Sequence, residues 1–100
     1  MKILIKDIVK SKTAIAYDDG VKCLDLVLKS LDEEGAVTLD FQDVEFVITA
    51  FLNPVIGDLI IKKGPEIMKK VQITHATKNI IEKIKIVKDG ALLKREECEK

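Results

Sequence analysis

Few side chains in this sequence could perform chemistry, and none of them belongs to a recognisable catalytic pair. His75 is the single histidine, and the two cysteines, Cys23 and Cys98, lie far apart in the chain. A His–Cys or Ser–His nucleophile pair would have to be assembled by the fold, because no local signature brings such residues together. His75 follows an apolar strand pattern, where it is either a ligand in a loop or, in the simpler interpretation that we favour, part of a turn.

Two carboxylates, Asp40 and Asp43, stand near the end of another apolar run, in the sequence LDFQD. Asp40 could orient a group of a binding partner, or it could accept hydrogen bonds from the backbone amides of the turn at Gln42 and Asp43. The pair lacks the histidines or further carboxylates of a metal site, and the sequence contains neither G-x-G-x-x-G nor a Walker loop. We therefore expect a protein that is not an enzyme and that holds no metal or cofactor.

The elements that must position these side chains are clearest between Ala36 and Leu59. An apolar run over residues 37–41 ends at Gln42-Asp43, and a second run over 44–48 leads directly into a helical pattern over 49–63. A strand that feeds a helix begins a βαβ unit, and ligands of open α/β sheets gather at the carboxyl ends of the strands. The sequence therefore predicts that a functional site of this chain would lie within residues 42–54, next to Asp40.

On the amino-terminal side, residues 2–9 alternate as in a strand, and residues 13–17 could form a second short strand paired with it. Asp18 and Asp19 suit the N-cap and first turn of a helix. The apolar positions of this helix repeat with the helical period up to Leu31, and Gly35 suits the left-handed residue that ends a helix.

On the carboxyl-terminal side, residues 71–75 predict another strand, and Thr77 is expected to cap a last helix. The pair Asp89-Gly90 is a point at which this helix could break or kink. The charged tail, from about residue 94 to 100, is expected to fray.

This order of elements predicts one α/β domain over residues 1–100. Parallel strands joined by helical crossovers place their helices on a face of the sheet. We expect a mixed sheet of four to five strands with helices mainly on one face, strand 37–41 at its centre and strand 71–74 parallel to it. The residues expected in the core include Leu39, Phe41, Val55, Ile56 and Leu59.

The composition is that of an ordinary globular domain, with 47% hydrophobic and 34% charged residues. No apolar run reaches the roughly 20 residues that span a membrane, and the amino terminus lacks a signal-peptide pattern. We therefore expect a cytoplasmic protein without membrane contact. Residues 1–59 carry 6 Lys and Arg against 11 Asp and Glu, and residues 60–100 carry 11 against 6. Such asymmetry can indicate an electrostatically steered partner or a basic patch for nucleic acid, but we favour the simpler interpretation that most of these charges lie on solvated helix faces. With only four aromatic residues in 100 we expect no nucleic-acid partner.

The runs VTLDF-x-x-VEFV and TAFLNPVIG-x-L, within residues 37–59, resemble the STAS fold family, named for sulphate transporters and anti-sigma factor antagonists. They are most similar to its prokaryotic STAS-like branch of unknown function. The similarity is close over residues 36–59 and extends in pattern only to residues 20–34 and 71–88. It implies a sheet of four or five strands with helices on one face, in agreement with the order of elements.

The resemblance also implies a regulatory site from which this sequence departs. Typical antagonists carry an aspartate, two hydroxyl residues and a glycine where the loop meets the helix, and the second hydroxyl accepts phosphate from a partner kinase. Here these positions are Ile48, Thr49, Ala50 and Phe51. Ala50 has no oxygen to accept a phosphate, and Thr49 is expected to cap the helix rather than to serve as a displaced acceptor.

The role that the resemblance implies is a non-enzymatic regulatory module that binds another protein through the loop 42–53 and the exposed face of helix 49–63, with an ATPase of the histidine-kinase-like type among the candidates. The candidate residues of this surface are Asp40, Gln42, Asp43, Thr49, Ala50 and Asn53. The alternative is a STAS-like domain that senses a small molecule or a nucleotide. A third hypothesis is a phosphate carrier on Thr49. The sequence leaves open whether the module acts alone or as a homodimer.

Overall fold

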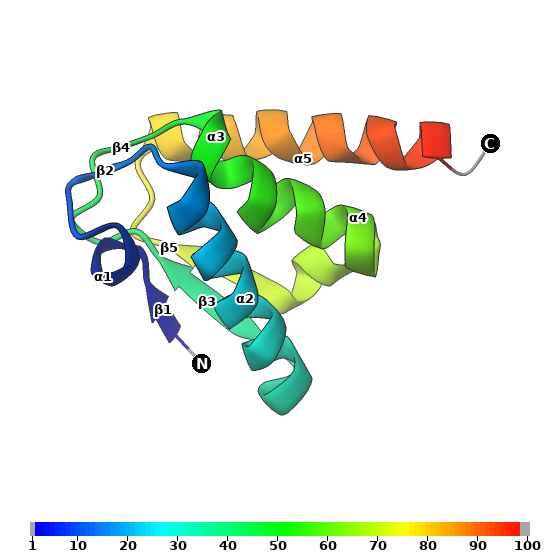
Figure 1. The fold of residues 1–100 in the computed structure, drawn as a ribbon, viewed down its shortest axis with the longest axis horizontal. Coiled ribbons are helices and arrows are strands. Elements are labelled where there is room, and N and C mark those ends of the chain that lie inside the picture. Colours follow the sequence, from blue (N-terminus) through cyan, green and yellow to red (C-terminus); the bar gives the residue numbers. More distant parts are fainter. Residues whose placement is uncertain (1, 99–100) are drawn as a thin grey trace.

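The computed structural model describes residues 2–98, which form five short strands and several helical segments (Figure 1). The elements, in which η1 is a π-helical segment and η2 a 3-10 helix, are β1 (Lys2–Leu4), α1 (Ile5–Val9), β2 (Thr13–Ala14), α2 (Tyr17–Glu34), β3 (Val37–Asp40), β4 (Phe46–Val47), α3 (Thr49–Leu52), η1 (Asn53–Asp58), α4 (Leu59–Lys63), η2 (Pro65–Lys70), β5 (Val71–Thr74) and α5 (Lys78–Cys98).

The strands form two small parallel sheets instead of the expected mixed sheet of four to five strands. One sheet has the order β1-β3-β5, so β3 is central and parallel to β5 as predicted, and the other pairs β2 with β4. The sheets separate because β1 is interrupted by α1 and β3 by the turn at residues 41–44. Beyond these interruptions the two segments pair again, so β2 pairs with β4 in parallel, as β1 pairs with β3.

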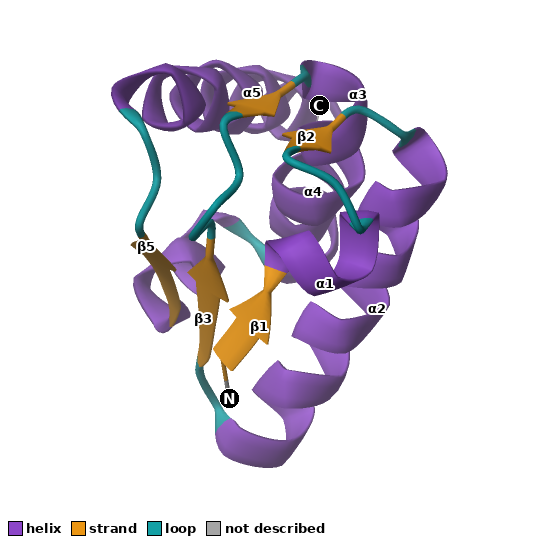
Figure 2. Ribbon diagram, turned by 90° about the vertical axis from the view of Figure 1, so that its left-hand side faces the viewer, coloured by secondary structure: helices purple, strands orange, loops and turns teal. Residues whose placement is uncertain are grey.

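Only one face of the three-stranded sheet is covered by the core. Ile3, Leu39 and Ile73 share a register position and point to the covered side, where Ile3 and Leu39 are buried. Lys2, Thr38 and Gln72 share the neighbouring register position and therefore lie on the open side. Figure 2 shows the three strands with the helices behind them and beside the β1 edge. The predicted core is confirmed, since Leu39, Phe41, Val55, Ile56 and Leu59 are all buried.

The predictions for the first two strands were wrong in extent and partner. The strand expected over residues 2–9 ends at Leu4, and residues 5–9 form a helix. Ile5, Ile8 and Val9 have helical spacing, and this turn packs all three against the core. The strand expected over 13–17 is only Thr13–Ala14, and it pairs with β4 rather than with β1.

Helix α2 begins at Tyr17, one residue before the predicted cap. Ala16 is the N-cap residue and provides no side-chain hydrogen bond, while Asp18 and Asp19 lie in the first turn, where carboxylates favour the helix dipole. Gly35 ends the helix with φ 77°, as predicted. Gly20 has a role that the sequence did not reveal. A Cβ there would lie 2.5 Å from Pro54 Cγ and closer still to the Phe51 carbonyl oxygen, so α2 crosses the segment 51–54 at this glycine.

The predicted helix 49–63 exists as three consecutive segments, α3, η1 and α4, and it leads from β3 to its parallel neighbour β5 as expected. The π-helical geometry of η1 coincides with Pro54 in its first turn. In an α-helix the ring of Pro54 would collide with the carbonyl group of Ala50, four residues earlier. Proline also has no N–H to donate a hydrogen bond to that carbonyl. A wider π-helical turn relieves this conflict.

Helix α5 begins at Lys78, and Thr77 caps it as predicted by accepting a hydrogen bond from Ile80 N (3.2 Å, to Oγ1). The helix passes through Asp89 and Gly90 without the break that was considered there. It continues to Cys98, so the backbone of residues 94–98 is helical, and the rest of the tail expected to fray lies outside the described residues. Figure 1 shows α5 crossing the molecule beside α3 and α4 and extending beyond them.

Candidate functional site

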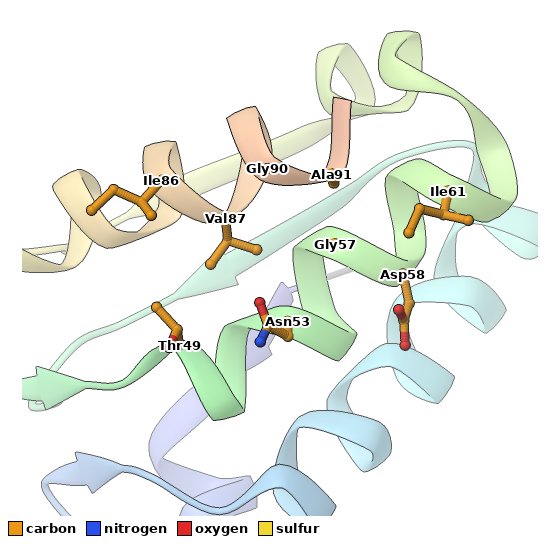
Figure 3. Close-up of a pocket in the computed structure, with 9 residues that line it drawn as sticks. All are labelled: Thr49, Asn53, Gly57, Asp58, Ile61, Ile86, Val87, Gly90 and Ala91. Atoms are coloured by element: carbon orange, nitrogen blue, oxygen red, sulfur yellow. The ribbon is translucent and has the colours of Figure 1, made fainter. Parts of the chain in front are cut away.

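A groove of about 380 Å³ lies between the helix 49–63 and α5. Figure 3 shows the two helices facing each other across it. Its lining consists of Thr49, Asn53, Gly57, Asp58 and Ile61 from the first helix and of Ile86, Val87, Gly90 and Ala91 from α5. One wall therefore offers a hydroxyl, an amide and a carboxylate, while the α5 wall offers aliphatic side chains.

Small residues keep the groove open. Gly57 faces α5 closely, because a Cβ there would lie 3.6 Å from Val87 Cγ1, which is ordinary van der Waals contact. Gly90, on the opposite wall, has no atom within 4 Å of the position that a Cβ would take. The rim carries two exposed aliphatic side chains, Ile61 (36% exposed) and Ile86 (62%). Exposed apolar side chains around a concave surface are typical of a binding site.

Lys83 fixes α5 to the start of this helix and so sets the width of the groove. Its ammonium group donates a hydrogen bond to the carbonyl oxygen of Val47 (2.7 Å) and lies 4.0 Å from the centroid of the Phe46 ring. Both partners belong to β4, directly before α3. A cation over an aromatic face adds electrostatic attraction to the hydrogen bond. The groove is therefore held at this end by a polar contact as well as by packing.

Two of the predicted site residues, Thr49 and Asn53, lie in this groove, and both are exposed. The prediction that Thr49 caps the helix was wrong, because Ile48 is the N-cap residue and makes no side-chain cap bond. Thr49 instead begins the helix, and its side chain faces the groove (Figure 3). Ala50 is half-buried and is not part of the lining.

The other predicted residues, Asp40, Gln42 and Asp43, lie together at the carboxyl end of β3. Here the Asp40 carboxylate is fully buried and accepts a hydrogen bond from the backbone N–H of Gln42 (2.9 Å, to Oδ1), one of the two roles that the sequence allowed. Asp43 is the third residue of the turn 41–44, with φ 65°, and its carboxylate accepts a hydrogen bond from the Lys6 ammonium (3.1 Å). The loop 42–53 is thus divided between this turn and the groove, with β4 between them.

Asp40 has two further neighbours, and neither was predicted. His75 Nδ1 lies 2.9 Å from Asp40 Oδ1, and the Lys2 ammonium lies 3.1 Å from Oδ2 as an ion pair without the direction of a hydrogen bond. Burial alone would raise the pKa of Asp40. The Gln42 amide, Lys2 and His75 together outweigh it and lower the pKa from 3.8 to about 2. Asp40 is therefore ionised at every physiological pH.

The sequence could have indicated the Asp40–His75 pair but not the far wall of the groove. Asp40 and Thr74 end neighbouring parallel strands and are register partners, so the residue after Thr74 falls beside Asp40. A prediction of that register would have been enough to find the contact. Ile86, Val87, Gly90 and Ala91 had no such signal, because their pattern along α5 is that of an ordinary amphipathic helix.

The remaining features of the described residues are simple. Cys23 is buried in α2, where burial raises the pKa of its thiol to about 12, so its surroundings suit a packing role rather than a reactive one. Residues 2–98 contain no group of three His, Cys, Asp or Glu side chains that could hold a metal ion. Among their helices, none combines the length and the apolar character that crossing a membrane requires.

Parallel βαβ connections, one open sheet face and a groove beside the helix after β3 define a small α/β domain. The profile of the STAS-like domain family of unknown function (DUF4325) matches residues 19–86, and the chain belongs to this family. No curated protein and no solved structure matches the chain. The family match begins in α2 and ends in α5, so it contains both walls of the groove up to Ile86.

Proposed function

We propose that the domain is a non-enzymatic regulatory module that binds a partner protein in the groove between the helix 49–63 and α5. The observation that carries this proposal is the groove itself, with its exposed Ile61 and Ile86 rim. It lies on the helix at which the resemblance to anti-sigma factor antagonists implies a partner.

The walls of the groove favour an amphipathic helix of the partner. The aliphatic side chains of α5 suit its apolar face, and Thr49, Asn53 and Asp58 suit polar groups along one side. The half-buried carboxylate of Asp58 would accept a lysine or arginine. A stable interface usually buries about 800 Å² on each partner, so the exposed rim must take part together with the groove.

The partner that we propose is a signalling protein, and an ATPase of the histidine-kinase-like type is the first candidate that the resemblance implies. Ala50 stands at the usual acceptor position and has no oxygen. Recognition is therefore expected to depend on the shape of the groove rather than on phosphate at the start of this helix. Stoichiometric phosphate on Thr49 in protein from the native host would contradict this part of the proposal.

The experiment is capture from the native host followed by binding of the purified pair. Ile86→Glu places a charge on the rim, and Ile81→Glu, on an exposed residue of the same helix outside the groove lining, is the matched control. The captured protein must bind the wild type and Ile81→Glu in purified form, and it must lose binding to Ile86→Glu. A partner that binds the wild type and both variants equally would rule out the groove as the docking site.

A second candidate function is the sensing of a small molecule or nucleotide, and the volume of the groove favours it. About 380 Å³ falls within the range of roughly 300–1,000 Å³ that small-molecule pockets occupy. Native mass spectrometry of the purified protein tests this directly. The Gly90→Gln variant fills the groove, so a ligand that the wild type retains and this variant loses would favour the sensor. In the same measurement, a mass of two chains would favour a homodimer.

The setting that we propose is the cytoplasm, with no membrane or nucleic-acid partner. The buried thiol of Cys23 and the balanced charge of the whole chain support this setting. Without excess positive charge, the domain lacks the counterion-release term that drives nucleic-acid binding. A titration that gave tight and strongly salt-dependent binding to DNA or RNA would contradict the proposal.

A further inference from the structure

A second site lies at the carboxyl ends of β3 and β5, apart from the groove lining. His75 follows β5 directly, and its ring is 59% exposed, whereas the Asp40 carboxylate behind it is not exposed at all. The two are joined at 2.9 Å through Nδ1 of the ring. An exposed imidazole is therefore held from behind by a buried acid.

The surroundings fix this pair in one arrangement. The Asp40 carboxylate is held on Oδ1 by the Gln42 amide and approached on Oδ2 by the Lys2 ammonium. His75 has φ 55°, in the left-handed region that residues other than glycine seldom occupy. Such a conformation persists where the neighbouring structure determines it, and it occurs often at functional sites.

This arrangement assigns the chemistry of the two ring nitrogens. An ionised carboxylate can only accept hydrogen bonds, so Nδ1 carries a proton and donates a hydrogen bond to Asp40 Oδ1. In the neutral ring Nε2 then has a free lone pair, and it is the nitrogen that the carboxylate does not bind. The same carboxylate would stabilise the positive charge that the ring gains when Nε2 forms a bond.

An imidazole with a free Nε2 lone pair can itself act as a nucleophile, without a hydroxyl or thiol to activate. The nearest hydroxyl in the sequence, Thr74 Oγ1, is buried and makes no hydrogen bond within the described residues, to His75 or to any other group. Lys2 presents an ammonium group that is 58% exposed and pairs with Asp40 Oδ2, so it offsets part of the negative charge of the carboxylate behind the ring.

We propose that His75 is a phosphoacceptor, phosphorylated on Nε2 by a partner that supplies a phosphoryl group from a nucleoside triphosphate. The Nε2 lone pair forms the N–P bond, and the P–O bond to the nucleoside diphosphate breaks, with its electron pair leaving on that oxygen. The ring keeps the Nδ1 proton and becomes positively charged opposite Asp40. This modification site goes beyond docking in the groove and can be tested without any partner.

Phosphoramidate, a small phosphoryl donor that releases ammonia, is the probe. Since His75 is the single histidine of the chain, modification of histidine can occur at one position only. We expect intact-mass spectrometry to show one added phosphoryl group, labile in acid and stable in alkali, and peptide mapping to place it on His75. His75→Gln should give none. Absence of phosphate on His75 in the folded wild type would overturn the proposal.

Two variants separate an activated histidine from one that is merely exposed. Asp40→Asn should slow the phosphorylation at least tenfold, because the proton on Nδ1 is no longer fixed and the cation is not stabilised. Asp43→Asn, which removes an exposed carboxylate of the same turn, is the matched control and should react like the wild type. Equal rates for Asp40→Asn and the wild type would contradict the role of Asp40.

A comparison of folded and unfolded wild type gives the same decision if Asp40→Asn does not fold. In denaturing urea the Asp40–His75 contact is absent, and the ring reacts as a free imidazole. We expect the folded protein to react at least tenfold faster per histidine than the unfolded chain. A folded rate equal to or below the unfolded one would show that the structure does not activate His75. Neither result depends on whether a partner occupies the groove.

Discussion

Asp40 is the residue whose surroundings are most specific, because a fully buried carboxylate is bound by an amide, an ammonium group and an imidazole. The Gln42 hydrogen bond was one of the alternatives that the sequence offered, since a carboxylate two residues before a turn commonly accepts its amides. The contacts with Lys2 and His75 depend on the parallel register of three strands. No local pattern contains that register, so a correct prediction of the strand register was needed to find these contacts.

The pH dependence of stability tests this set of contacts. Although burial disfavours the charge, the three partners lower the pKa of Asp40 from 3.8 to about 2. A lowered pKa in the folded state means that the carboxylate stabilises the fold above about pH 4 and that this contribution is lost as the pH falls towards 2. We expect the difference in unfolding free energy between wild type and Asp40→Asn to shrink over that interval. Denaturant titrations that gave a constant difference from pH 5 to pH 2 would contradict the assignment.

Cys23 gives a second prediction for a single residue. Its thiol is buried in α2, and burial raises its pKa to about 12, so both the thiolate and access to it are scarce. In a Cys98→Ser variant, where Cys23 is the remaining thiol, we expect denaturant to increase the rate of alkylation by at least ~100-fold. Fast alkylation of the native protein would show that α2 opens readily or is packed differently.

Among the elements, α2 and the helix 49–63 were the most predictable, because their apolar residues repeat with the helical period and Gly35 marks an end. The short elements were not predictable. Residues 2–9 alternate like a strand, yet Ile5, Ile8 and Val9 also have helical spacing, and the core that they contact decides between the two. The π-helical turn at Pro54 likewise results from a conflict between proline and helix continuity that the pattern of apolar residues does not contain.

The close crossing of α2 and the helix 49–63 depends on Gly20. Alanine variants of two helical glycines, Gly20 and Gly90, test this dependence. Gly20→Ala would push a methyl group into the Phe51 carbonyl oxygen and the Pro54 ring, so we expect a loss of about 1–3 kcal/mol in unfolding free energy. Gly90 also lies in a helix but has open space around it, so Gly90→Ala should be neutral or stabilise by about 0.5–1 kcal/mol. Thermal and denaturant unfolding measure both, and a Gly20→Ala protein as stable as the wild type would refute the close crossing.

For the molecule as a whole, the α/β class, the central position of β3 and the parallel pairing with β5 followed from the order of elements. The division into two sheets did not, because it depends on where β1 and β3 are interrupted. The groove joins residues 49–61 to residues 86–91. The wall formed by residues 49–61 was expected from the family resemblance. The wall formed by α5 depends on the path of that helix, which is fixed by the contacts of Lys83 with Phe46 and Val47.

The most direct test of docking in the groove is the affinity of the purified partner for two rim variants, measured by calorimetry. Ile86→Glu should weaken binding at least tenfold, because a charge replaces an apolar side chain on the rim of the groove, which the partner is expected to cover. Ile81→Glu, with a similar exposure on the same helix, should bind like the wild type, and both variants should unfold like it. Equal affinity for Ile86→Glu and the wild type, or an equal loss for both variants, would contradict the account.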